Sequence, residues 1–255
     1  MKEKATSSIQ VIDRMAQLLD AIAQGHGPVS LKVLSAETGL HPSTAHRILA
    51  ALGEHGLVER TEAGHYRLGI KLLGLASRVE QRVDLKREAL PIMEWLRSEL
   101  GETVNLTVRD GDEVVYVERV SSHKMIRVEQ VIGGHAPLHV TAVGKLFLAF
   151  DGKADCLAYA RRTRLPAYTP TTLTQPGQLW DEAKRSLEQG YALDNEEAET
   201  GVGCIGVPVL DASGKMVAGL SVSAPIARRS DEWIAVTITA GKRLSARLGY
   251  FGGKS

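Results

Sequence analysis

Polar residues recur at helical spacing within residues 42–54, in a pattern that could contact DNA. Three of them, Ser43, His46 and Arg47, share one face of a helix with the small residue Ala50, at i, i+3, i+4 and i+7. Short hydroxyls, an imidazole and a guanidinium can reach base edges and phosphates inside a major groove about 12 Å wide. The pattern predicts a DNA-reading face that consists of Ser43, Thr44, His46 and Arg47.

A second set of polar residues, in the later part of the chain, suits a small oxygen-rich anion. Thr141 and the three residues after it open a predicted helix, whose first N–H groups attract a carboxylate, and Gly144 would let a ligand approach closely. Ser221 and Ser223 are two residues apart on a predicted strand and so share a face. Cys204 could line the same cavity, and Asp194 offers an acceptor. The alternative is that these small residues only pack in a core.

The elements that position the first set are two short helices joined by a tight turn within residues 31–57. Ser30 is a suitable cap for a helix over residues 31–38, and Gly39 fits the left-handed position that ends it. Pro42 suits the first turn of the next helix. An apolar stripe on this second helix predicts its buried face: Ala45, Ile48, Leu49 and Leu52.

A wing is predicted to follow this helix-turn-helix. Residues 57–60 and 65–68 favour strands around the turn at residues 61–64. A further helix, capped by Ser8, is predicted to precede the motif and to run to about Gln24. We expect the wing to touch phosphate or the minor groove through Arg60, His65, Tyr66 and Arg67. A small helical domain with a merely solvated polar face is the alternative, but three helices and a wing in this order favour DNA binding.

Composition sets the outer limits. The chain has 255 residues, with 44% hydrophobic and 24% charged residues, which is typical of a soluble protein of two domains. It has no apolar run of about 18 residues and no signal-peptide core, so we expect a cytoplasmic protein without membrane contact. Cys156 and Cys204 form no C-x-x-C pattern, and we predict neither a disulfide nor a metal or cofactor. The net charge of +1 means that only a local patch could hold DNA.

The chain divides into three predicted parts. Residues 1–69 form the winged helix-turn-helix domain, residues 70–100 a helical linker with apolar stripes, and residues 101–255 a second domain. A partner subunit would cover part of the linker. In the second domain, strands are predicted near 104–108, 115–120, 126–131, 204–210 and 216–223, and helices near 141–150, 154–162, 178–189 and 231–249. The mixture indicates an α+β domain.

Several tracts resemble the isocitrate lyase regulator (IclR) family of bacterial transcription factors. They are residues 190–197 (GYALDNEE), 204–211 (CIGVPVLD), 133–145 (GGHAPLHVTAVGK) and 8–22. The resemblance covers about residues 8–250. It implies an N-terminal winged helix, a linker helix and a C-terminal effector-binding domain similar to the GAF fold, assembled as dimers or dimers of dimers on operator DNA.

In that family the C-terminal domain binds a small organic ligand, typically a carboxylate or aromatic catabolite, and this binding changes the affinity of the regulator for operator DNA. The resemblance implies effector contacts at Ala142, Val143, Asp194, Cys204, Ser221 and Ser223. Many family members have a smaller residue in place of Val143, so a valine would narrow the cavity.

Two other classes of function are alternatives to a regulator. A hydrolase fused to a DNA-binding domain would need an activated nucleophile; Cys204 and His139 are the only evident pair, and no third residue orients them. We expect His139 to be a hydrogen-bonded histidine and the chain not to be an enzyme. A ligand-independent DNA-binding protein would leave the polar set around Ser221 without a role. The sequence therefore favours a regulator of a catabolic operon that responds to a small organic acid.

Overall fold

The computed structural model describes residues 10–25, 27–80 and 84–252. The chain divides into two compact units, and the second begins at Asp84. The helix start predicted at Ser8 lies outside the described residues. Among the helices that the structure describes, none combines the length and the apolar composition needed to cross a membrane.

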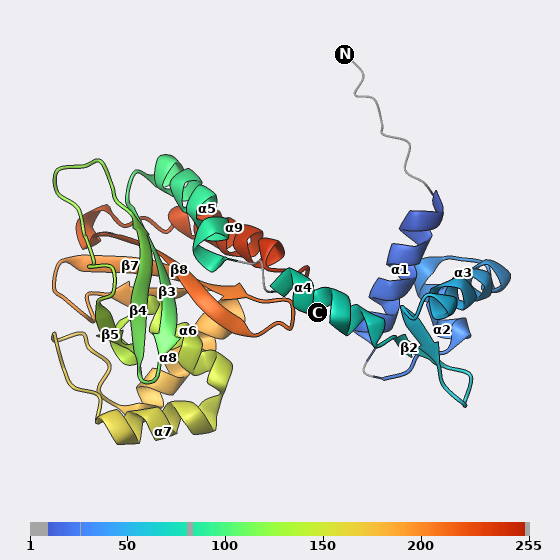
Figure 1. The fold of residues 1–255 in the computed structure, drawn as a ribbon. Coiled ribbons are helices and arrows are strands. Elements are labelled where there is room, and N and C mark those ends of the chain that lie inside the picture. The colour runs from blue at the N-terminus through green and yellow to red at the C-terminus, as the bar shows by residue number, and fades with distance from the viewer. Residues whose placement is uncertain (1–9, 26, 81–83, 253–255) are drawn as a thin grey trace, which may run out of the picture. The chain divides into compact units, whose positions relative to one another are not determined.

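The first unit has the predicted helix-turn-helix and wing (Figure 1). Ser30 accepts a hydrogen bond from the N–H of Val33, and Gly39 ends the second helix with φ at 68°. Leu18, Leu34 and Leu49 come from the three helices and meet in one core. The elements are α1 (Gln10–Gln24), α2 (Leu31–Thr38), α3 (Pro42–Glu54), β1 (Val58–Arg60), β2 (Tyr66–Leu68) and α4 (Lys71–Glu80).

The second unit is built on an antiparallel sheet in the order β5-β4-β3-β8-β7-β6. Its strands are β3 (Thr103–Asp110), β4 (Glu113–Val120), β5 (His135–Pro137), β6 (Ala192–Asn195), β7 (Val202–Leu210) and β8 (Met216–Pro225). Its helices are α5 (Leu85–Leu100), α6 (Ala142–Asp151), α7 (Lys153–Thr163), α8 (Pro176–Gln189) and α9 (Trp233–Arg247). The predicted α+β class is confirmed.

Helices cover both faces of this sheet, as Figure 1 shows. On one face, Leu106 and Leu220 pack with residues of α5 and α9 in an apolar core. Side chains alternate along a strand, so the neighbouring positions Asn105 and Ser221 lie on the other face, which α6 covers. That second face carries the buried polar residues, and it is where a ligand site can form.

The predicted linker over residues 70–100 needs correction. Its second half is α5, whose Ile92, Met93 and Leu96 are buried in the core with α9 and the sheet. The apolar stripe is covered within the second unit itself, so α5 is part of that domain. Only α4 remains from the predicted linker.

The strand predicted at residues 126–131 is wrong. This segment has no strand, and Ile126 and Val131 are largely exposed. β4 pairs instead with β5, and the N–H of Gly133 donates to the carbonyl of Tyr116 at 2.7 Å. The alternation of apolar residues was therefore not a sign of a buried sheet face.

Candidate functional site

The predicted reading face of α3 is exposed on the first unit. Ser43, His46 and Arg47 are exposed and Thr44 is partly buried, whereas the predicted apolar stripe of the same helix is buried. The helix thus presents short polar side chains on one side and is anchored to the core by the other. Their contacts with DNA stay a prediction.

His41 forms the N-cap of α3, which the sequence reasoning missed. Its Nδ1 accepts the N–H of Ser43 and lies 2.8 Å from the Ser43 hydroxyl. Asn, Asp, Ser and Thr are the usual caps, so a histidine before Pro42 gave a weak signal. The imidazole orients one residue of the reading face.

The wing residues divide into exposed and buried ones. Arg60 and Arg67 are exposed and His65 is partly buried, but Tyr66 is only 3% exposed and belongs to the core. The backbone N–H and carbonyl of Tyr66 pair with Val29, which fixes its side chain inward. The predicted contact of the Tyr66 side chain with DNA does not fit this burial. Its ring instead supports the Arg60 guanidinium, which lies 5.8 Å from the ring centroid.

Arg67 is paired in the free protein. Its guanidinium lies 2.7 Å from the Glu59 carboxylate, and this partner holds the pKa of Glu59 below its usual value. Glu59 also accepts a hydrogen bond from the backbone N–H of Ile70. A phosphate contact by Arg67 would have to compete with Glu59.

A cavity of about 560 Å³ lies on the α6 side of the sheet in the second unit. Five of the predicted effector residues line it, namely Ala142, Val143, Asp194, Cys204 and Ser221. Strand register explains why residues far apart in sequence meet here. Asp194 pairs with Cys204, which pairs with Ser223, and alternate positions of these strands share one face.

Two predicted effector residues do not line the cavity. The N–H of Gly144 donates to the Thr141 hydroxyl at 3.0 Å, and a Cβ at this glycine would lie 2.2 Å from the carbonyl oxygen of Leu138. Gly144 therefore serves close packing of α6 and not the approach of a ligand. Ser223 is buried two residues after Ser221 on β8 and does not line the cavity. Its hydroxyl accepts a hydrogen bond from Asn105 and lies 3.1 Å from the Cys204 sulfur.

Several residues that line the cavity were not predicted from the sequence, among them Thr107 on β3 and Tyr116 on β4, whereas Thr141, named as the start of the helix, also lines it. Tyr116 alternates with Val115 and Val117 along β4 and shares the cavity face with Val114. The alternation was visible in the sequence, but which face of β4 would carry a ligand was not.

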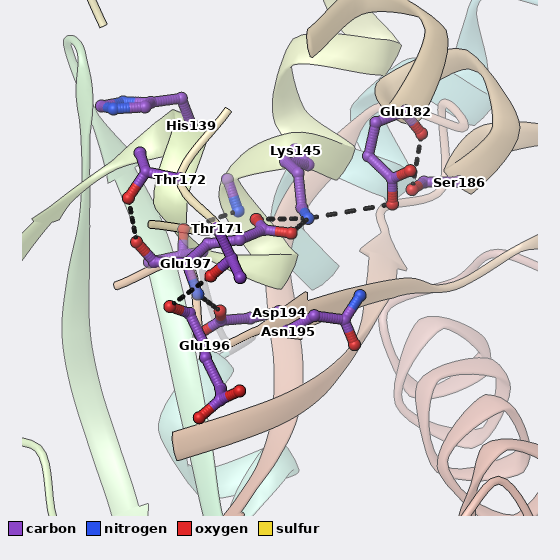
Figure 2. Close-up of polar contacts among 12 residues, drawn as sticks. His139, Lys145, Thr171, Thr172, Glu182, Ser186, Asp194, Asn195, Glu196 and Glu197 are labelled. Atoms are coloured by element: carbon purple, nitrogen blue, oxygen red, sulfur yellow. Dashed lines mark hydrogen bonds and ion pairs between the residues drawn. The ribbon is translucent and has the colours of Figure 1, made fainter. Parts of the chain in front are cut away.

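Asp194 is the buried carboxyl group of this cavity. One of its oxygens accepts the N–H of Glu197 at 2.7 Å (Figure 2). Burial raises the pKa of Asp194 to about 6, and the nearby Glu197 charge acts in the same direction. Burial, together with Asp194, also raises the pKa of the Cys204 thiol.

A buried ion pair lies directly behind the cavity. The Nζ of Lys145 on α6 is 2.6 and 2.8 Å from the two carboxylate oxygens of Glu197, and 3.8 Å from Glu182 (Figure 2). The hydroxyl of Thr172 donates to the carbonyl of Glu197, and that of Thr171 to the carbonyl of Glu196. The ion pair holds the segment after β6, which forms one wall of the cavity, against α6, and the two threonines hold it against the segment that precedes α8.

The pair needed for a cysteine hydrolase is not assembled. The two ring nitrogens of His139 lie 2.9 Å from the Tyr159 hydroxyl and 3.0 Å from the carbonyl of Pro166, which confirms a hydrogen-bonded histidine. Cys204 contacts Ser223 instead and has a raised thiol pKa, so it is a poor nucleophile. Within the described ranges, no cluster of His, Cys, Asp or Glu is arranged to hold a metal ion.

Both units of the chain match family models of known transcriptional regulators. The model of the IclR helix-turn-helix domain matches residues 11–62, and that of the bacterial transcriptional regulator IclR C-terminal domain matches residues 77–246. The chain is 34% identical over 247 residues to the HTH-type transcriptional regulator XynR of Escherichia coli, covering 95% of this chain and 98% of XynR. It is 32% identical to the Escherichia coli transcriptional repressor IclR, covering 96% and 92%.

Two solved structures are also similar. The Agobacterium tumefaciens repressor BlcR has a TM-score of 0.73 at 28% identity, over 97% of this chain and all of that chain. An IclR homologue from Microbacterium hydrocarbonoxydans, complexed with 4-hydroxybenzoate, has a TM-score of 0.61 at 26% identity, over 93% and 98%. These likenesses agree with the fold described above.

Proposed function

This chain belongs to the IclR family and is a DNA-binding transcriptional regulator, not an enzyme, and we propose that it regulates a catabolic operon in response to a small organic acid. The observation that carries the proposal is the cavity whose wall combines Asp194, Ser221 and the first residues of α6. A regulator that needs no ligand would have no use for such a cavity.

The cavity lining supports an organic acid as the ligand. Its volume of about 560 Å³ is within the usual range of small-molecule sites. The start of α6 favours a carboxylate, and the Ser221 hydroxyl can donate to one of its oxygens. The complex of the Microbacterium relative with 4-hydroxybenzoate is a precedent for such a ligand. Val143 reduces the space next to the helix start.

The proposed mechanism is thermodynamic linkage between the two sites. The chain carries a net charge of only +1, so one winged helix would bind DNA weakly, and we expect two or more copies to act together. An effector that prefers one arrangement of the dimer would change operator affinity about 5- to 150-fold, for a coupling of about 1–3 kcal/mol. A thermal-shift screen against organic acids tests the proposal most directly, because a ligand at about 100 times its Kd stabilises by about 2.7 kcal/mol.

Replacing Arg47 by alanine will weaken operator binding. If the guanidinium contacts a base, affinity will fall about 5- to 150-fold and specificity will relax at one operator position. Binding is measured by fluorescence anisotropy on an operator selected from a random-sequence library. Lys153→Ala on α7 is the control, because it removes an exposed charge from the other unit. Equal affinity of Arg47→Ala and wild type would remove Arg47 from the reading face.

Replacing Ser221 by alanine will weaken the effector response without weakening DNA binding in the free state. Loss of one hydrogen bond to an anion corresponds to about a tenfold rise in the effector Kd. Isothermal titration with the acid found in the screen gives this Kd, and operator release gives the response. Ser98→Ala, on the exposed side of α5, is the matched control. An unchanged Kd in Ser221→Ala would show that the acid binds elsewhere.

A further inference from the structure

The phenol of Tyr116 is the least explained polar group of the cavity. It extends from β4, whose register places Tyr116 beside Thr107 on β3. In the part of the chain that the structure describes, no hydrogen bond to this phenol is found. Burial, followed by the nearby Cys204 and Asp194, raises the pKa of Tyr116, so the phenol keeps its proton and is a donor.

The groups that surround this phenol determine what it can recognise. The carboxyl of Asp194 and the thiol of Cys204 line the same cavity and are close enough to the phenol to act on its charge. The nearest buried cation, Lys145, is bound to Glu197 and Glu182 and does not line the cavity. The basic lining residues are outer ones that already have acidic neighbours, with Arg127 beside Glu129 and His135 beside Glu113. Glu199, at the rim, adds negative charge.

A ligand at this end of the cavity therefore meets a donor and an acceptor together. A hydroxyl fits both, because it can accept from the phenol and donate to the carboxylate of Asp194. A second carboxylate would be repelled by Asp194, and an ammonium group could not accept from the phenol. An apolar end would leave the phenol without a partner and would offer the Asp194 carboxylate nothing beyond the hydrogen bond that it already accepts from the N–H of Glu197.

We propose that Tyr116 is a specificity-determining residue, and that with Asp194 it selects organic acids that carry a hydroxyl group over the same acids without it. The inference rests on the proposed function and narrows its ligand class to hydroxy acids. The carboxylate of such an acid would lie at the start of α6, and its hydroxyl between Tyr116 and Asp194. Sites built to hydrogen-bond a hydroxyl discriminate strongly against the analogue that lacks it.

The test uses three matched pairs of acids and the full-length protein. Isothermal titration at pH 7.5 measures the Kd of glycolate against acetate, lactate against propionate, and 4-hydroxybenzoate against benzoate. We expect wild type to bind the hydroxy acid of at least one pair about tenfold or more tightly. Tyr116→Phe keeps the ring and should lose this preference, with the Kd of the plain acid unchanged. Tyr168→Phe, the same change on an exposed residue outside the cavity, should retain it.

The outcomes separate the inference from the proposed function. If wild type binds these acids without preference, or Tyr116→Phe retains the preference, the role of Tyr116 is overturned while an acid-responsive regulator stands. If none of the six acids releases heat or raises the melting temperature of wild type, the small-acid effector is itself wrong and the inference falls with it. Circular dichroism establishes that Tyr116→Phe is folded before either conclusion is drawn.

Discussion

Replacing Lys145 by methionine will lower the free energy of unfolding of the second unit by about 3–5 kcal/mol. The Lys145 side chain is 0% exposed and its ammonium group is held by both oxygens of Glu197. Removing it leaves the Glu197 carboxylate, 6% exposed, without its cation in a low-dielectric environment. An unpaired buried charge is among the few causes of so large a loss. Chemical denaturation at pH 7.5, followed by circular dichroism, measures it.

A second variant distinguishes charge from packing. In Lys145→Met with Glu197→Gln, no charge of the pair is left buried, so most of the lost stability should return. Lys184→Met is the matched control, because Lys184 forms an exposed pair with Glu188 on α8 and should change stability by less than about 1 kcal/mol. A double variant that is no more stable than Lys145→Met would show that the loss of stability does not come from an unpaired Glu197 charge.

Replacing Asp194 by asparagine will stabilise the free protein at neutral pH and not at acid pH. In the folded protein the pKa of Asp194 is raised from 3.8 to about 6, so the folded state binds the proton more tightly than the unfolded state. This carboxyl favours folding most below pH 3.8, and that contribution is lost as the pH rises to about 6. The difference corresponds to about 3 kcal/mol above pH 6, at about 1.4 kcal/mol for each pKa unit. Asparagine resembles the protonated acid and keeps an acceptor for the N–H of Glu197.

The measurement is the difference in unfolding free energy between Asp194→Asn and wild type at pH 4.5 and at pH 7.5. We expect a small difference at pH 4.5 and a gain for the variant at pH 7.5. Asp181→Asn, an exposed residue of α8, is the control and should show no such trend. A difference independent of pH would contradict the raised pKa. If the Asp194 carboxylate lowers the stability of the wild type in this way, its presence is consistent with a role in ligand binding, since binding sites often contain groups that destabilise the fold.

The sequence by itself determined the winged helix of the first unit. Its signals are local: the cap at Ser30, the left-handed Gly39, Pro42 at a helix start, and the apolar stripe of α3 opposite its polar face. Each depends on residues within one or two helical turns, so spacing alone was enough. The same is true of most helices and strands of the second unit.

Only the tertiary structure decided which of these residues act together. Tyr66 is buried because β2 pairs with Val29, and α5 joins the second unit because its apolar face packs on α9. The pairing of Lys145 with Glu197 spans 52 residues. Tyr116 and Asp194 meet in one cavity because β4 and β6 belong to one sheet through the strands between them.

The physical reason is that side-chain spacing determines which residues share a face of a helix or strand, but not which other helix or strand that face packs against. Helical and strand periodicity follow from the backbone of a single segment. The order of strands in a sheet, and thus which polar positions converge, depends on burial and hydrogen bonding between distant segments. The sequence therefore indicated a reading face and five cavity residues, whereas the Lys145–Glu197 pair and the phenol of Tyr116 emerged only from the arrangement of the sheet.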